Sequence, residues 1–309
     1  MNHRTRHLAT ALLGLSLLAS SPDALSDEWS DPPAPAAETA DAFPDPAAPV
    51  NVELELSLLV DASASMDNAE YTLQMEGYAA AFRDSQVQDA ALGIGGIAVR
   101  YVTWSDDDHQ MTFGWMQLTS VNDCKRFADR IEAMGRPFSS GTVMASAIHE
   151  TLYSIEHNNY VSTRQVIDVS GDGADSNFSF RDKFFTRFQT LDGATDAQRR
   201  DFYDDTAEFW TVDRSTFVSD IGTLGTDAIF KRHFGLPWAD VVAKRPTTMV
   251  INGISIGSDP EMQAWYAREM PQGDGAFVMH ADDFGSFGYS IKQKLIREIT
   301  ELPVPTSYD

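Results

Sequence analysis

The chain has 309 residues, of which 43% are hydrophobic, and this is enough for one large core or two smaller ones. It carries 46 acidic and 23 basic residues, so its net charge of −23 repels nucleic-acid backbones and anionic lipid surfaces. The single cysteine, Cys124, cannot form an internal disulfide, so the fold must depend on its core, on bound metal, or on both. These features exclude a wholly disordered chain and argue against a nucleic-acid partner.

Residues 1–26 have the pattern of a secretory signal peptide. Arg4 and Arg6 precede an apolar run, Ala11 to Ala19, and small residues suited to cleavage follow it. The run is far shorter than the about 20 apolar residues that a membrane-spanning helix needs, and no later stretch reaches that length. We therefore expect a periplasmic or secreted protein without stable membrane insertion.

Residues 27–50 are rich in Pro, Ala and Asp, which is typical of a tether. The folded domain is expected at 51–302, with a tail at 303–309. Its hydrophobic patterns alternate between strand and helix, which predicts an α/β fold with a doubly wound, mostly parallel sheet and helices on both faces. Expected strands lie at 52–60, 97–104, 111–118 (at an edge), 165–170, 248–256 and 276–280, and expected helices at about 71–82, 122–134, 143–157, 260–270 and 284–299.

Residues 177–244 interrupt this alternation after the fourth loop of the parallel sheet. They are too many for an ordinary connection, which usually has about 2–6 residues. Their many aromatic side chains indicate a packed insertion rather than a loose loop. Such an insertion could shield a nearby site, provide a surface for a specific partner, or act only as a spacer.

Oxygen-bearing side chains occur in three of the predicted turns. Asp61, Ser63 and Ser65 occupy alternate positions directly after the first strand, Thr142 precedes a helix, and Asp172 follows the strand at 165–170. Because the carboxyl ends of parallel strands converge at one edge of the sheet, these side chains can meet there. Carboxylate and hydroxyl oxygens are ligands of hard cations such as Mg²⁺. The alternative is that these residues only cap helices and close turns.

Three short motifs follow one another along the chain: the DASAS loop at 61–65, the Gly-Thr pair at 141–142 and the Gly-Asp-Gly triplet at 171–173. Together they resemble the metal-ion-dependent adhesion site of von Willebrand factor type A domains. The segments SGTVMASAIHETL and IDVSGDGAD are similar, more narrowly, to an exported bacterial group of such proteins with no assigned activity.

The resemblance implies a divalent cation held by the same five residues, with Asp172 often acting through water. Mg²⁺ is the expected ion, and Mn²⁺ and Ca²⁺ are alternatives. Two carboxylates only balance a divalent cation, so a vacant coordination position can still attract an acidic side chain from a protein partner. The expected metal ligands are Asp61, Ser63, Ser65, Thr142 and Asp172.

Weaker patterns point to other functions. Ser255 lies in a Gly-Ile-Ser-Ile-Gly sequence typical of a hydrolase nucleophile, but no HGGG-type oxyanion segment precedes it and the base would have to be His280. The acidic run from Asp106 to His109 lacks the glycine and glutamate of a calcium-binding loop. His149 lacks the second histidine of a zinc-protease helix one turn later. We expect a binding protein that is not an enzyme, and the alternatives are a serine hydrolase using Ser255 or a metal-stabilised scaffold.

Overall fold

The structure is a computed structural model. It describes residues 37–38, 46–106, 109–210, 212–226, 228–230 and 238–300, without the side chains at 37–38, 177–182 and 240. The expected signal peptide at 1–26 and tail at 303–309 lie outside the described residues, as does most of the tether at 27–50. In the described part, no helix is long and apolar enough to cross a membrane.

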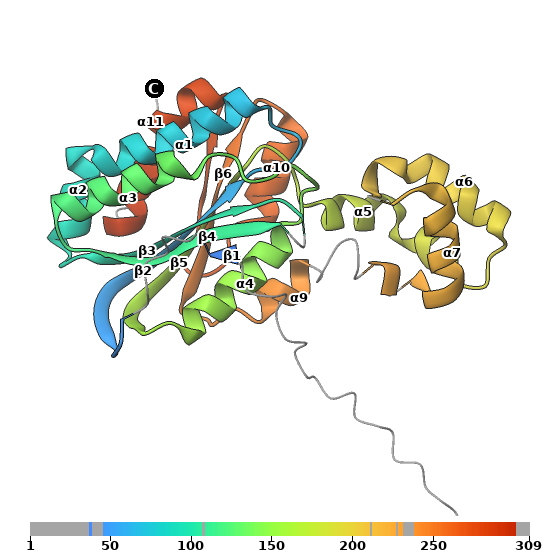
Figure 1. Cartoon of the computed structure of the whole chain (residues 1–309), viewed down its shortest axis with the longest axis horizontal. Helices are drawn as coiled ribbons and strands as arrows, with labels where there is room; N and C mark the ends of the chain where they lie inside the picture. The colour runs from blue at the N-terminus through green and yellow to red at the C-terminus, as the bar shows by residue number, and fades with distance from the viewer. Residues whose placement is uncertain are drawn as a thin grey trace, which may run out of the picture. The chain divides into compact units, whose positions relative to one another are not determined.

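A seven-stranded sheet lies at the centre of the domain, in the order β1-β4-β3-β2-β5-β6-β7 (Figure 1). Neighbouring strands are parallel except for β3 and β4, which are antiparallel. This confirms the predicted doubly wound, mostly parallel sheet. The strands are β1 (Ala37–Glu38), β2 (Val50–Asp61), β3 (Ile97–Trp104), β4 (Gln110–Leu118), β5 (Tyr160–Gly171), β6 (Met249–Ile256) and β7 (Val278–Ala281).

Helices cover both faces of this sheet. The side chains of β2 show why, because Leu56 and Leu58 contact one helix layer while Leu59 contacts the other. A strand buried on both faces is typical of a parallel sheet, and it leaves the strand ends as the places for a site. One layer contains α1 (Asn68–Arg83), α2 (Ser85–Gly93), α3 (Val121–Met134) and α11 (Phe284–Thr300), and the other contains α4 (Met144–His157), α9 (Trp238–Ala243) and α10 (Pro260–Glu269) (Figure 1).

Helix α1 begins with a capping box that follows the expected metal loop. The Asp67 carboxylate accepts a hydrogen bond from the Glu70 amide at 2.9 Å, and the Glu70 carboxylate accepts one from the Asp67 amide at 2.8 Å. Tyr71 and Tyr78 are buried on the inner face of the helix, as their spacing predicts. The loop at 61–65 is therefore held between a buried strand and a firmly capped helix.

The sequence patterns did not predict α2. This helix has nine residues, and the residues that it buries are Val87, Gln88 and Ala91. Since one of these three is polar and the helix makes only about two and a half turns, its apolar periodicity is too short to recognise.

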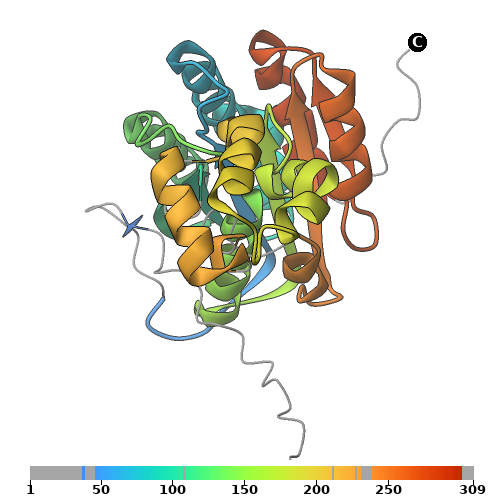
Figure 2. The same ribbon diagram turned by 90° about the vertical axis from the view of Figure 1, so that its right-hand side faces the viewer.

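Between β5 and α9 the chain forms a group of helices with its own core. Phe188, Phe202, Trp210 and Phe217 belong to a hydrophobic cluster separate from those of the sheet. Helices α6 and α7 pack against each other (Figure 2). The elements are α5 (Ser176–Gln189), α6 (Asp196–Thr206), the 3₁₀ helix η1 (Ala207–Phe209) and α7 (Arg214–Leu224).

Helix α9 also falls within the expected insertion, at 177–244, but it packs differently. Its Trp238 and Val241 side chains belong to the sheet core, and Trp238 lies against Trp265 with ring centroids 5.9 Å apart. The separately packed part of the insertion therefore ends before α9.

Candidate metal site

The first loop of the expected site leaves β2 at Asp61, whose side chain is fully buried. Asp61 Oδ1 accepts a hydrogen bond from the Ser63 amide at 2.7 Å, which turns the loop back on itself. The other carboxylate oxygen, Oδ2, is buried without a hydrogen-bond partner. Buried polar atoms rarely lack a partner, so this oxygen needs an explanation.

The second loop leaves β5, the parallel neighbour of β2, in the register that pairs Val60 with Ser170. This register brings the carboxyl ends of both strands together. The Ser65 hydroxyl donates a hydrogen bond to Asp172 Oδ1 at 2.6 Å, and it lies 2.9 Å from the Ser63 hydroxyl. Four of the five expected ligands thus form one continuous cluster of oxygens.

The third loop, which carries Thr142, is joined to the other two through its backbone. The Ser140 carbonyl accepts a hydrogen bond from the Ala64 amide at 2.7 Å, and the Thr142 carbonyl accepts one from the Ser176 amide at 2.8 Å. The Thr142 methyl group would lie 4.0 Å from a Cβ at Gly173, next to Asp172. All five residues therefore lie at the same edge of the sheet, although the role of each in binding metal stays a prediction.

Burial and like charge act together on the two carboxylates. Burial, followed by the nearby charge of Asp172, raises the pKa of Asp61 to about 7 from 3.8. Burial also raises the pKa of Asp172, although the hydrogen bond from Ser65 lowers it in part. A divalent cation would relieve this repulsion and give Asp61 Oδ2 a partner. In the described part, no three His, Cys, Asp or Glu side chains cluster as metal ligands, so hydroxyl groups must contribute to any such site.

Arg136 holds the first loop in place, and the sequence analysis missed it. Its Nη2 donates to the carbonyl oxygens of Ser63 at 2.6 Å and Ala62 at 3.1 Å, and its Nη1 donates to Asn68 Oδ1 at 3.0 Å. Its charge also works against the rise in the pKa of Asp172. No local motif marks this arginine, because its partners in the first loop and in α1 lie 68 to 74 residues away.

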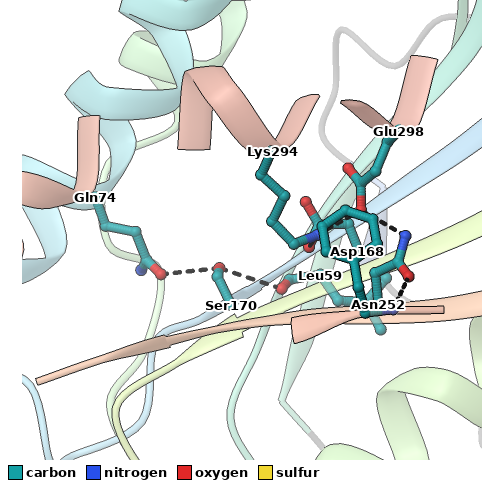
Figure 3. Close-up of polar contacts among 8 residues, drawn as sticks. Leu59, Gln74, Asp168, Ser170, Asn252, Lys294 and Glu298 are labelled. Carbon is teal, nitrogen blue, oxygen red and sulfur yellow. Dashed lines mark hydrogen bonds and ion pairs between the residues drawn. The ribbon is translucent and has the colours of Figure 1, made fainter. Parts of the chain in front are cut away.

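Gln74 ties the site to the core beneath it, and the sequence analysis missed it too. Its Nε2 donates to the Asp61 carbonyl at 2.9 Å, and its Oε1 accepts a hydrogen bond from the Ser170 hydroxyl at 2.9 Å (Figure 3). The ends of β2 and β5 are therefore linked through α1 as well as through the sheet.

A buried ionic network lies further along β5, between the sheet and α11 (Figure 3). Lys294 contacts the carboxylates of Asp168 and Glu298, and all three side chains are fully buried. Asn252 Nδ2 donates to Glu298 Oε1 at 2.9 Å. Burial, followed by the charge of Asp168, raises the pKa of Glu298 to about 7. We interpret this network as a structural link between α11 and the sheet.

The alternative sites that the sequence analysis considered occur in other surroundings. The Ser255 hydroxyl lies 2.5 Å from His280 Nδ1 on the neighbouring strand, but Ser255 is fully buried and burial lowers the pKa of His280. This hydroxyl is therefore not exposed to solvent in the structure. Of the acidic run, Asp106 pairs with His109 at 2.5 Å, and residues 107–108 lie outside the described residues. His149 is buried in the α4 layer.

The sheet order, the helices on both faces and the DASAS loop at one sheet edge match the von Willebrand factor type A-like fold that the sequence resembles. The family model described as "Protein of unknown function (DUF1194)" matches residues 51–191 and 237–303, so the chain belongs to this family. The unmatched interval contains α6 and α7. No curated protein sequence is significantly similar to the chain.

Solved structures that are similar to the chain include a minor pilin, a von Willebrand factor type A protein and a matrix protein of the mussel byssus. The PilB minor pilin from Streptococcus sanguinis is 13% identical, with a TM-score of 0.45, and the match covers 82% of this chain and 64% of the pilin. A von Willebrand factor type A protein from Catenulispora acidiphila is 11% identical, with a TM-score of 0.38, and the match covers 80% of this chain and 43% of that one.

Proximal thread matrix protein 1 from the mussel byssus, "with zinc occupied MIDAS motif", is also 11% identical. Its TM-score is 0.40, and the match covers 81% of this chain and 46% of that one. The chain thus spans 43% to 64% of the length of these three structures. At such low identities and TM-scores, these similarities carry no conclusion about the function of this chain.

Proposed function

We propose that the protein is an exported, non-catalytic binding protein that depends on a divalent metal ion. In this proposal the oxygens of the candidate site hold Mg²⁺, and an acidic side chain of a protein partner completes the coordination of the ion. The proposed ligands are Asp61, Ser63, Ser65, Thr142 and Asp172.

The observation that carries this proposal is the environment of the Asp61 carboxylate. Its Oδ2 is buried without a hydrogen-bond partner, and the charge of the like-charged Asp172 raises its pKa further. Two neighbouring carboxylates repel each other, and a buried oxygen without a hydrogen-bond partner costs free energy, unless a cation joins them. The linked hydroxyls of Ser63 and Ser65 supply further neutral oxygens at the same place.

The charges of the site favour an acidic partner. The two carboxylates neutralise a divalent ion without excess negative charge, so one more carboxylate can still bind it. Arg136 adds a fixed positive charge beside the loop. The proposed site has few charged ligands and several hydroxyl or water oxygens. Such a set suits Mg²⁺ better than Ca²⁺, because Mg²⁺ keeps part of its water shell whereas Ca²⁺ takes 6–8 oxygens. Mn²⁺ is an alternative ion.

Metal binding is tested by thermal unfolding with Mg²⁺, Mn²⁺ or Ca²⁺. We expect Mg²⁺ to raise the midpoint, since a ligand at a hundred times its Kd stabilises the folded state by about 2.7 kcal/mol. Asp61→Ala should abolish the rise. Asp84→Ala, which removes the cap of α2 outside the site, should lower the midpoint but keep the rise. An equal rise in wild type and Asp61→Ala would refute the proposed site.

Partner binding is tested by capture from the envelope of the source cell, with and without chelator. A captured protein that is released by chelator and absent with Asp61→Ala supports metal-dependent binding. Capture that persists in Asp61→Ala favours a scaffold whose metal only stabilises the fold. Labelling of Ser255 by a fluorophosphonate probe would favour the hydrolase alternative, and we expect none.

A further inference from the structure

A cavity of about 560 Å³ lies between α6 and α7. Its walls carry three arginines, Arg199 and Arg200 from α6 and Arg214 from the start of α7, but only one acidic residue, Asp196. Acidic residues outnumber basic ones two to one in the whole chain, whereas here the arginines are in excess even when Asp204, which pairs with Arg214 from outside the wall, is counted. The cavity also lies in the interval that the family model does not match.

The single carboxylate in the wall holds its two arginines weakly. Arg199 Nη1 lies 3.4 Å from Asp196 Oδ1, and Arg200 Nη2 lies 3.9 Å from Asp196 Oδ2. Charge-assisted hydrogen bonds between a guanidinium and a carboxylate are normally about 2.7–2.9 Å long. The Asp196 side chain is also 63% exposed, so water screens its charge. Both guanidinium groups thus keep donors for another acceptor.

Of the three arginines, Arg199 is the one whose positive charge most requires a counterion. Its side chain is only 12% exposed, and its Nε is buried without a hydrogen-bond partner. A guanidinium carries five N–H donors and stays charged at any physiological pH. A buried charge without a closely bound counterion costs free energy. An anion in the cavity would supply both the missing charge and the missing acceptors.

Two neighbouring residues position these arginines. A Cβ at Gly222, on α7, would lie 2.6 Å from Arg199 Nη1, so this glycine makes room for the guanidinium group. Glycine inside a helix costs about 1 kcal/mol relative to alanine, and room for Arg199 explains why it is present. Asp204 holds Arg214 through contacts of 2.7 and 3.1 Å from Nη1 to its two oxygens.

We propose that the cavity between α6 and α7 binds an oxyanion group, either a carboxylate or a phosphate, through Arg199, Arg200 and Arg214. The planar fork of a guanidinium matches two oxygens of such a group at once. This site is separate from the candidate metal site and does not require it. It assigns the inserted helices the role of binding an anionic ligand.

The test measures anion binding by calorimetry on the full chain carrying Asp61→Ala, so that anions cannot act through the candidate metal site. Inorganic phosphate and succinate are titrated separately, at an ionic strength held constant with sodium chloride. We expect saturable binding of at least one anion. Phosphate binding alone assigns the site to phosphorylated ligands, and succinate binding assigns it to carboxylates.

The double variant Arg199→Gln/Arg200→Gln should weaken this binding tenfold or more. The matched control Arg126→Gln/Arg268→Gln changes the net charge equally at two exposed arginines outside the cavity and should leave Kd unchanged. Gly222→Ala alters no charge but displaces Arg199, and it should also weaken binding.

Two results would overturn the proposal. One is the absence of saturable binding for both anions, and the other is an equal Kd in the control and in the cavity variants. If the double variant does not fold, as judged by circular dichroism, Arg200→Gln decides instead, because its side chain is 53% exposed and its loss should leave the fold intact.

Discussion

Gly171 stands where two buried oxygens crowd the end of β5. A Cβ at this position would lie 2.7 Å from both Asp61 Oδ2 and the Tyr266 hydroxyl. Both of these atoms are buried without hydrogen-bond partners, and Asp61 belongs to the candidate site. At the residue scale, the absence of one methyl group therefore allows the site to exist.

We expect Gly171→Ala to lower the free energy of unfolding by about 1–3 kcal/mol, because the added carbon overpacks the strand end. It should also reduce stabilisation by Mg²⁺, since Asp61 must move. The control is Gly93→Ala, where a Cβ meets nothing within 4 Å and a neutral or slightly stabilising effect is expected. Urea unfolding with and without Mg²⁺ measures both, and equal effects of the two substitutions would contradict this account.

Glu298 provides a residue-scale prediction about pH. Its carboxyl group has a pKa of about 7 in the folded protein against 4.5 ordinarily, so the folded state keeps a proton that the unfolded state releases between these values. The free energy of unfolding should therefore fall as pH rises from about 4.5 to about 7. Glu298→Gln cannot release this proton, so its stability should decline less steeply over that window.

Urea unfolding across that pH range measures the difference. The control is Glu132→Gln, whose carboxylate is 46% exposed and bound to Arg83, with a pKa that this contact lowers. It should keep the slope of the wild type. A slope in Glu298→Gln as steep as that of the wild type would show that this group does not hold a proton in the folded state.

At the scale of elements, the two groups of helices differ in what they pack against. The helices of the sheet domain bury their apolar faces on β-strands, whereas α6 and α7 bury theirs in a separate aromatic cluster. The family model matches the chain on both sides of these two helices but not across them. Each group therefore has a core of its own.

We expect the sheet domain to fold without the inserted helices. Replacing residues 184–236 by a short Gly-Ser linker removes the separate aromatic cluster and keeps all strands of the sheet. The shortened protein should unfold in one cooperative transition and should still be stabilised by Mg²⁺. Circular dichroism during heating measures both. The same deletion with Asp61→Ala is the control and should lose the metal effect, while failure of the shortened protein to fold would refute this independence.

At the scale of the whole molecule, charge is the dominant feature. A net charge of −23 creates self-repulsion that opposes the compact state. Added salt screens this repulsion over a distance of about 10 Å at 0.1 M. We expect sodium chloride to raise the midpoint of thermal unfolding, with potassium chloride giving the same rise and uncharged sucrose serving as a control for solvent exclusion. No response to either salt would show that the repulsion is already balanced locally.

Local sequence patterns were sufficient for much of this protein. Apolar periodicity predicted the strands β2 and β3, because this pattern depends on neighbouring residues. The order of the three turns also predicted that their loops lie at one edge of the sheet, since parallel strands bring their carboxyl ends together there, while the role of these residues in binding metal stays a prediction.

Only the tertiary structure decided the surroundings of these oxygens. The contacts of Arg136 and Gln74, the burial of Ser255 and the network around Lys294 depend on how strands and helices are packed. The contacts of Gln74 with Asp61, of Arg136 with Ser63 and of Lys294 with Asp168 span 13, 73 and 126 residues of the chain. The burial of Ser255 depends on the layers around it. Periodicity and motifs describe separations of a few residues, so contacts of this range follow from the packing of the whole domain.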